Sequence, residues 1–259
     1  MSEIVGIFMS GCCGRMGRAI NEMVINSDGA EIVAGCDLSD NIGGLDFPVF
    51  KNIDDCNVDF DCIIDFSNVS AFDSVLNFAL KLKKPLVMCT TGLTEDNLKA
   101  LEDASKIIPV FKSANMSIGM NVMIELCKKA SKFLYPGYDI EIVEAHHNKK
   151  LDAPSGTALM LADAIKDEVK SNTDVDMNYV FERQSVRKQR SVDEIGISSI
   201  RGGNIVGEHD VMFIGGEEVL TVSHSAQTRA VFARGAVSAA LFVKGKEPGY
   251  YSMSDMINF

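Results

Sequence analysis

Short apolar runs alternate with amphipathic stretches along the first half of the chain. Five runs have the length of buried strands: 4–9, 31–36, 61–66, 86–89 and 107–111. Between the first two, apolar side chains recur at helical spacing (Met16, Ala19, Ile20, Met23), and similar stripes follow the later runs. Strands that alternate with helices over short connections predict an α/β fold with a Rossmann-like, doubly wound parallel sheet.

The pattern changes in the second half. Helices are predicted over 117–134 and 158–169, with a strand over 138–143 between them. Four strand candidates then follow without long helices between them: 177–181, 195–200, 205–214 and 219–222. We therefore expect a dinucleotide-binding domain over 1–116, rejoined by 228–259. The segment 117–227 is expected to form a second α+β domain built on an open mixed sheet, for substrate binding and oligomerisation.

Composition narrows the class of protein. The net charge is −11 at pH 7, which argues against a nucleic-acid partner, because such proteins usually carry a basic face. The chain contains neither an apolar stretch of membrane-span length nor a signal segment, so we expect a cytoplasmic protein without a membrane partner. The seven cysteines lack C-x-x-C spacing, and no metal site is predicted.

The first chemical motif lies between the first predicted strand and helix. Gly11, Gly14 and Gly17 form G-x-x-G-x-x-G, a variant of the dinucleotide-binding fingerprint, and the loop between them contains Cys12, Cys13, Arg15 and Met16. Gly11 allows a tight turn, Gly14 lets a pyrophosphate approach the helix, and Gly17 lets helix and strand pack closely. A plain turn with a helix cap is the alternative interpretation.

Asp37 supports the dinucleotide interpretation. It lies 20 residues after Gly17 at the end of the second strand, where an acid binds the hydroxyls of the adenosine ribose. The next residue is Leu38, which cannot pair with a 2′-phosphate, so NADH is expected over NADPH. NADPH use stays open, because Arg15 or Lys51 could reach such a phosphate.

The second motif covers residues 144–157, EAHHNKKLDAPSGT, between a predicted strand and helix. His146 and Lys150 can transfer protons, and the N–H groups that open the following helix can bind an anion. The alternative is structural, with one histidine packed and the other solvated. Lys149 is expected to be a solvated neighbour, and Asp152 can equally be a turn residue. His209 and His224, on strands further along, are expected to be structural.

These motifs closely resemble those of the 4-hydroxy-tetrahydrodipicolinate reductase (dihydrodipicolinate reductase) family, over nearly the whole chain. The stretch EAHHxxKxDAPSGTA is the family's site signature, and GRMG at 14–17 resembles its cofactor loop. The resemblance also covers four further segments: Cys89-Thr90-Thr91-Gly92, Ser113-Ala114-Asn115-Met116-Ser117, GEH at 207–209 and HSAQTR at 224–229. Cys89 departs from the family's usual glycine, and Cys12 and Cys13 replace residues that are often small.

The resemblance implies an oxidoreductase of lysine biosynthesis via diaminopimelate. It would reduce 4-hydroxy-tetrahydrodipicolinate with NAD(P)H to tetrahydrodipicolinate. His146 and Lys150 would be catalytic, with the proton coming from either. His147, Gly156 and Thr157 would bind a small dicarboxylate substrate. Cys89, Thr90, Thr91 and Ser113, Ala114, Asn115, Met116 would join the glycine loop in binding the cofactor. The family is typically a homotetramer, with substrate in the cleft between domains.

Three other functions share parts of this pattern. A dehydrogenase for homoserine or a sugar would share the first domain, but it would not explain the 144–157 stretch. An NADH-sensing regulator would not need His146 and Lys150. A Schiff-base aldolase using Lys150 would not need the glycine loop.

Overall fold

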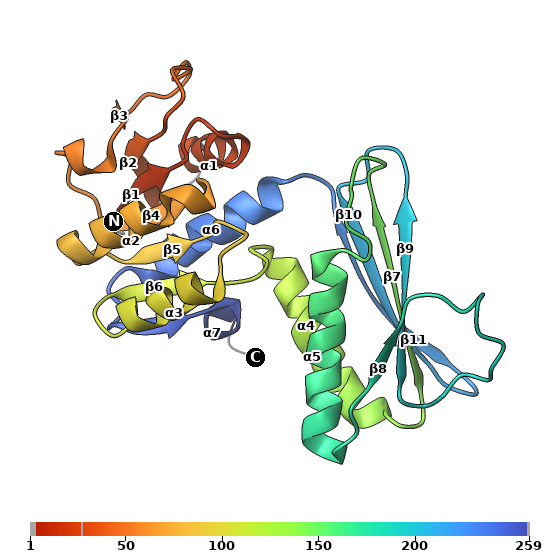
Figure 1. Cartoon of the computed structure of the whole chain (residues 1–259). Coiled ribbons are helices and arrows are strands. Elements are labelled where there is room, and N and C mark those ends of the chain that lie inside the picture. The colour runs from red at the N-terminus through yellow and green to blue at the C-terminus, as the bar shows by residue number, and fades with distance from the viewer. Residues whose placement is uncertain (1–3, 27, 258–259) are drawn as a thin grey trace. The chain divides into compact units, whose positions relative to one another are not determined.

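The computed structural model describes residues 4–26 and 28–257, and they form two compact units (Figure 1). The described residues up to Ile118, together with the segment from Arg229, form the first unit. Gly119–Thr228 forms the second unit.

The first unit is built on a seven-stranded parallel sheet. Its strands, in spatial order, are β12 (Gly249–Tyr251), β6 (Pro109–Lys112), β5 (Leu86–Met88), β4 (Cys62–Asp65), β1 (Val5–Ser10), β2 (Ala30–Cys36) and β3 (Val49–Phe50). All adjacent pairs run parallel. Since the order reverses beside β1, the loops after β1 and β4 diverge there, which is where such folds bind ligands.

Helices cover both faces of this sheet. Helices α1 (Arg15–Ile25) and α6 (Ala230–Val243) pack on one face, through side chains such as Ile20 and Ala236. Helices α2 (Phe72–Leu82) and α3 (Glu95–Ala104) pack on the other, through Val75 and Leu101. Both faces are buried, which explains why the strands read as continuous apolar runs. Short elements complete the unit: α7 (Met253–Ile257) and two 3₁₀ turns, Ile53–Asp55 and Val69–Ala71.

The second unit is a five-stranded mixed sheet covered on one face by two helices (Figure 1). Its strands, in spatial order, are β11 (Val219–Ala226), β10 (Gly207–Ile214), β7 (Asp139–His146), β9 (Glu194–Arg201) and β8 (Asn178–Val180). Strand β7 pairs antiparallel with β10 and parallel with β9. Helices α4 (Ile118–Leu134) and α5 (Gly156–Thr173) bury one face of the sheet in a core that includes Ile142 and Phe213.

The predicted fold class is confirmed, and the differences are local. The short strands β3 and β12 and the helix α7 were not predicted, because two to five residues are too few for periodicity to register. The basic, polar segment 183–190 is an irregular loop that is exposed over 183–189, as its composition predicts, and Arg190 at its end is half-buried. Arg190 donates to the Asp139 carboxylate at 2.7 Å and to the Glu194 carbonyl at 2.6 Å. Within the described residues, no helix is long and apolar enough to cross a bilayer.

Candidate active site

The 144–157 stretch joins the central strand of the second sheet to helix α5. Strand β7 ends at His146, and α5 begins at Gly156 after a nine-residue connection. The Ser155 side chain caps the helix, because its Oγ accepts the N–H of Ala158 at 3.1 Å. Gly156 and Thr157 are therefore the first two helical residues, whose N–H groups point out of the helix end.

A buried carboxylate, Glu144, lies beneath this connection. Its side chain is 0% exposed, and Arg201 donates to both carboxylate oxygens, at 2.7 and 2.8 Å. The Ser155 N–H donates to Oε1 at 3.1 Å. Burial alone would raise the pKa of Glu144, but hydrogen bonds from Arg201, the Ser199 side chain and His146 outweigh it. They lower the pKa to about 2, so Glu144 is an anion at neutral pH.

His146 is buried against this anion. Its Nδ1 lies 2.6 Å from Glu144 Oε2. Its Nε2 faces Gly207 on the neighbouring strand, where a Cβ atom would lie only 3.1 Å from that nitrogen. One ring nitrogen of His146 is therefore bound to a carboxylate, and the other lies against a residue that has no side chain.

His209, which we expected to be structural, lies next to His146. The two rings are 5.2 Å apart and nearly perpendicular, at 78°. The Nε2 of His209 lies 3.2 Å from Ser155 Oγ. Burial, reinforced by the neighbouring His146, lowers the pKa of His209 to about 4. His209 is therefore a neutral imidazole within the site.

His224 faces His209 across the β10–β11 ladder. Burial lowers the pKa of His224 as well. Together with His146, these residues make a cluster of imidazoles at one end of the sheet.

The remaining predicted substrate residues lie on the connection itself. Lys150 is mostly buried and pairs with Asp152 at 2.9 Å, and its hydrogen bond lowers the pKa of Asp152. The positive charge of Lys150 also contributes to the lowered pKa of His209, which places the amine near the histidines. Lys149 is exposed, as predicted for a solvated neighbour. His147 is half-buried, and its Nδ1 has no hydrogen-bond partner within the described residues.

The glycine loop in the first unit has the close packing that its motif predicts. Gly11 has φ +79°, and a Cβ there would lie 2.7 Å from the Phe66 carbonyl oxygen. A Cβ on Gly17 would lie 2.4 Å from the Gly11 carbonyl oxygen, so only glycine lets α1 approach the loop. Gly14 is the N-cap of α1, which therefore starts without a side-chain cap. The helix start is thus available to an anion such as a pyrophosphate.

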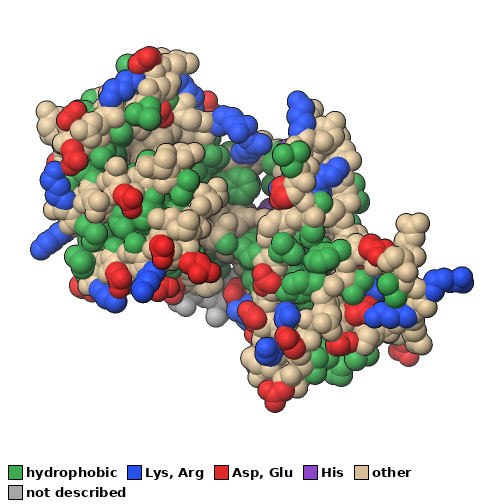
Figure 2. All heavy atoms as spheres, in the orientation of Figure 1, with side chains coloured by type: hydrophobic (Ala, Val, Ile, Leu, Met, Phe, Trp, Pro, Cys, Tyr) green, Lys and Arg blue, Asp and Glu red, His purple; other side chains and the backbone are tan. Residues whose placement is uncertain are grey.

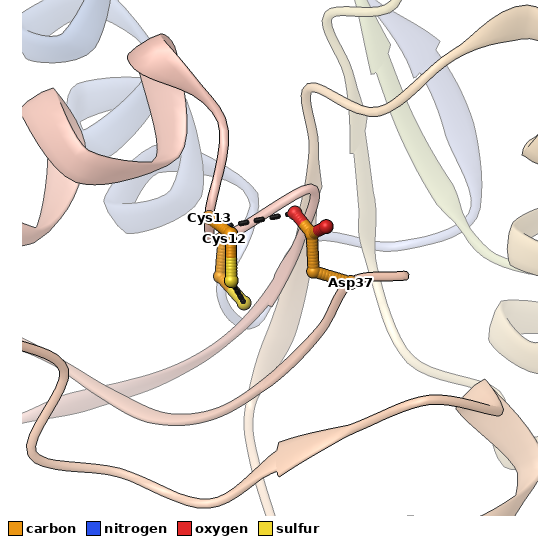
Figure 3. A group of neighbouring side chains, drawn as sticks. All are labelled: Cys12, Cys13 and Asp37. Carbon is orange, nitrogen blue, oxygen red and sulfur yellow. Dashed lines mark hydrogen bonds between the residues drawn. The ribbon is translucent and has the colours of Figure 1, made fainter. Parts of the chain in front are cut away.

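Asp37 lies beside this loop at the end of β2 (Figure 3). Its carboxylate accepts the N–H of Cys13 and of Ser39, each at 2.9 Å. The Sγ atoms of Cys12 and Cys13 are 4.0 Å apart. Burial, aided by Cys13 and Asp37, raises the pKa of Cys12 to about 12, which keeps it a neutral thiol at neutral pH.

A cavity of about 500 Å³ lies beside the glycine loop and Asp37, and residues from the segment 66–75 after β4 also line it. Its wall includes Gly11, Gly14, Asp37, Leu38 and Lys51. The Lys51 amine is held by the carbonyl oxygens of Leu38 and Ser39, at 2.9 and 2.6 Å, and by Asp40 at 2.8 Å. Arg15 is exposed at the start of α1, and Met16 is half-buried beside it.

The other predicted cofactor residues lie at the same carboxyl edge of the parallel sheet. Cys89 and Thr90 follow β5, and the hydroxyl of Thr90 donates to the buried Asp65 at 2.6 Å. Thr91 is exposed. The segment with Ser113, Ala114, Asn115 and Met116 follows β6, and Asn115 accepts the Ser117 N–H at 2.8 Å.

Sequence analysis gave no role to several residues: Asp65, Ser67 and Lys112 at the sheet edge, and Arg201 together with Glu144 and Ser155 of the 144–157 motif around His146. Asp65 and Lys112 are polar residues at the end of an apolar run, and Ser155 precedes a helix, so local signals existed. Arg201 carried no local signal, because its partner lies 57 residues earlier.

Family models and curated relatives both identify the same family for this chain. The family model described as "Dihydrodipicolinate reductase, N-terminus" matches residues 5–116, and "Dihydrodipicolinate reductase, C-terminus" matches residues 119–257. The chain is 49% identical to the 4-hydroxy-tetrahydrodipicolinate reductase of Clostridium tetani, covering 98% of both chains. It is 48% identical to that of Caldanaerobacter subterraneus subsp. tengcongensis, with the same coverage.

Solved structures agree in fold. Dipicolinate-bound dihydrodipicolinate reductase from Paenisporosarcina sp. TG-14 superposes with a TM-score of 0.81 at 23% identity, covering 96% of this chain and 98% of that one. The myo-inositol dehydrogenase from Lactobacillus casei, solved with NAD(H) and myo-inositol, gives a TM-score of 0.58 at 18% identity, covering 98% and 91%. At these identities the likeness shows the fold alone.

Proposed function

The chain belongs to the dihydrodipicolinate reductase family, and we infer from this that it reduces 4-hydroxy-tetrahydrodipicolinate to tetrahydrodipicolinate with NAD(P)H. The reaction is a step of lysine biosynthesis via diaminopimelate. One observation of the structure carries the inference. His146 and Lys150 lie on the short connection that leads from the end of β7 to the open N-terminus of α5. Groups that can transfer a proton therefore lie next to helix N–H groups that can bind an anion.

Proton transfer is assigned to His146 and Lys150. The nicotinamide cofactor, when bound, supplies the hydride that adds to C4 of the ring after water is lost. As C4 gains the hydride, the electron pair moves to the neighbouring carbon, which must then take up a proton. We assign the delivery of this proton to His146, whose Nε2 faces Gly207, or to Lys150, whose side chain is 22% exposed.

Substrate charge is assigned to the start of α5. A carboxylate there would meet the N–H groups of Gly156 and Thr157 and the positive end of the helix dipole. Gly156 has no side chain to block this approach, and among the described residues nothing beyond its chain neighbours and its own helix backbone lies within 4 Å of where its Cβ would be. Lys150 adds a direct charge, and His147 adds an imidazole nitrogen that lacks a partner within the described residues.

Cofactor binding is assigned to the carboxyl edge of the first sheet. The glycine loop (Gly11 to Met16) would hold the pyrophosphate, and Asp37 the adenosine ribose. The residues after β5 (Cys89, Thr90, Thr91) and β6 (Ser113, Ala114, Asn115, Met116) would approach the nicotinamide end. We propose NADH as the preferred cofactor. A 2′-phosphate would face the carboxylate of Asp37, and the nearby Lys51 amine already has three oxygen partners.

We propose that residues 1–116 and 228–259 form the dinucleotide-binding domain, and that 117–227 bind substrate and assemble a homotetramer. The face of the second sheet opposite α4 and α5 supports assembly. It carries Ile200, 51% exposed, and Val219, 56% exposed, together with the half-buried Met212. A second copy of this sheet would cover these side chains.

Nucleic acid is not proposed as a partner. On the face that Figure 2 presents, Lys and Arg side chains are interspersed with Asp and Glu, rather than gathered into a basic patch. This distribution agrees with the net charge of −11. A small anionic substrate needs only the local donors described above.

The test is NADH oxidation that depends on the product of dihydrodipicolinate synthase, repeated with NADPH. We expect turnover with both cofactors and a higher kcat/KM with NADH. Folded protein that binds NADH but shows no turnover with this substrate would contradict the proposed reaction. A higher kcat/KM with NADPH would overturn the role given to Asp37 and leave the reaction itself intact.

A further inference from the structure

We propose that Glu144 is the positioning residue of this site. Its carboxylate fixes the tautomer of His146 and, through the Ser155 amide, sets the start of α5 relative to that imidazole. The inference rests on the proposed role of His146 in proton transfer. It adds that Glu144 binds Nδ1 of the imidazole and so leaves Nε2 to exchange the proton.

The carboxylate divides its two oxygens between the two halves of the site. Oε2 contacts His146 Nδ1 at 2.6 Å and one Arg201 nitrogen at 2.8 Å. Oε1 accepts the Ser155 N–H at 3.1 Å and the other Arg201 nitrogen at 2.7 Å. Each carboxylate oxygen therefore accepts a hydrogen bond from the Arg201 guanidinium. Oε2 also contacts the His146 imidazole, and Oε1 also accepts from the N-cap residue of α5.

This arrangement leaves one choice for the His146 tautomer. An ionised carboxylate only accepts hydrogen bonds, so the proton between Oε2 and Nδ1 belongs to the imidazole. In its neutral form, His146 then carries hydrogen on Nδ1 and a lone pair on Nε2. The exchanging atom is Nε2, the nitrogen that faces Gly207.

Arg201 keeps this anion in place and balances its charge. It belongs to β9 and lies directly opposite His146 in the β7–β9 register. It also donates to the carbonyl oxygens of Ile200 and Asp152, each at 2.7 Å. The bidentate pair holds the Glu144 carboxylate in one orientation. The pair is also neutral overall, so the anionic substrate does not approach an unbalanced negative charge.

The Ser155 contact links proton transfer to anion binding. Ser155 is the N-cap of α5, and its Oγ touches both the Ala158 N–H and the His209 ring. Because Glu144 holds the Ser155 backbone and the His146 ring at once, the first N–H groups of α5 have a fixed distance from Nε2. A substrate carboxylate bound at the helix would thereby be presented to the imidazole in one register.

A structural alternative exists in the same strand. Glu141 also pairs with arginines, at 2.6 Å to Arg183 and 3.3 Å to Arg190, and within the described residues it forms no hydrogen bond or ion pair with a histidine. If Glu144 acted only as an ion pair tying β7 to β9, its replacement would affect stability much as replacement of Glu141 does. Glu141→Gln is therefore the matched control.

The experiment compares wild type, Glu144→Gln and Glu141→Gln. Histidine labelled with ¹⁵N reports the tautomer of each ring by NMR, and the four histidines are assigned through single substitutions. Wild-type His146 is expected to carry hydrogen on Nδ1. In Glu144→Gln, the amide can turn its NH₂ toward Nδ1 and shift hydrogen to Nε2. We expect kcat to fall at least about a hundredfold with a smaller change in KM for the substrate, while NADH affinity stays unchanged. Glu141→Gln should match wild type in tautomer and kcat.

Two results would overturn the proposal. One is a wild-type His146 with hydrogen on Nε2, which is decisive even if Glu144→Gln fails to fold. The other is a folded Glu144→Gln that keeps kcat within about threefold of wild type, well short of the loss expected for an acid–base group. If wild type shows no turnover, the proposed function has failed, and the tautomer measurement alone still decides what Glu144 does to His146.

Discussion

The free energy of unfolding should fall less between neutral and acid pH when His209 is replaced with Gln. His209 is 3% exposed, its Nε2 contacts Ser155 Oγ at 3.2 Å, and its pKa is about 4 in the folded chain. A glutamine amide can replace that contact without titrating. The ordinary histidine pKa is 6.5, so the unfolded chain takes up this proton before the folded chain does.

The sign and size follow from linkage. The stability contributed by the neutral imidazole is complete above pH 6.5 and is lost as the pH falls from 6.5 toward about 4. A difference of about 2.5 pKa units corresponds to about 3 kcal/mol in total, of which about 2.5 kcal/mol is lost by pH 4.5. Glu144, Lys150, His146 and His224 all influence His209, but they remain in the variant, so the difference between the two proteins isolates His209.

The assay is urea unfolding of wild type and His209→Gln at pH 8 and pH 4.5, with equal m-values as the condition for comparison. At pH 8 we expect the variant to be less stable by about 1 kcal/mol, the typical cost of a buried substitution. At pH 4.5 the gap should close or reverse. Stability curves that fall in parallel between the two pH values would refute a neutral, buried His209.

Three further predictions concern the site. Gly207→Ala places a Cβ 3.1 Å from His146 Nε2, so we expect kcat in the coupled assay to fall at least about tenfold in a protein that still folds. An unchanged kcat would contradict the role of that nitrogen. Asp37→Ala should weaken NADH binding, measured by calorimetry, at least about tenfold, which is the loss expected for hydrogen bonds to a charged group. NADPH binding should weaken less, and equal losses for the two cofactors would show that Asp37 does not select between them. N-ethylmaleimide labelling, followed by mass spectrometry, should be faster at the half-exposed Cys13 than at the buried Cys12, and NADH should slow the labelling of Cys13. Equal rates of Cys13 labelling with and without NADH would place Cys13 outside the cofactor site.

Features written in short stretches of sequence were predictable. The glycine loop depends on residues a few positions apart, and the structure gives Gly11 and Gly17 the close backbone approaches that the motif requires. The 144–157 stretch likewise contains its own strand end, cap and helix start. Such features follow from local conformation, which a sequence pattern can report.

Features that depend on strand pairing were not predictable. Arg201 reaches Glu144 only because β9 lies parallel to β7 in one register, and His209 reaches His146 only because β10 lies on the other side. Neither neighbour is visible from residues adjacent in the chain. His209 was therefore expected to be structural, although its ring lies 5.2 Å from that of His146.

The most direct test of the account is the kcat of His146→Ala and Lys150→Ala in the coupled assay, with Lys149→Ala as control. Lys149 is exposed and adjacent in sequence to the mostly buried Lys150. We predict that His146→Ala and Lys150→Ala each lose at least about a hundredfold in kcat, the usual scale for general acid–base groups, while Lys149→Ala keeps near-normal turnover. Near-normal turnover in both His146→Ala and Lys150→Ala would contradict the assignment of proton transfer to the end of β7.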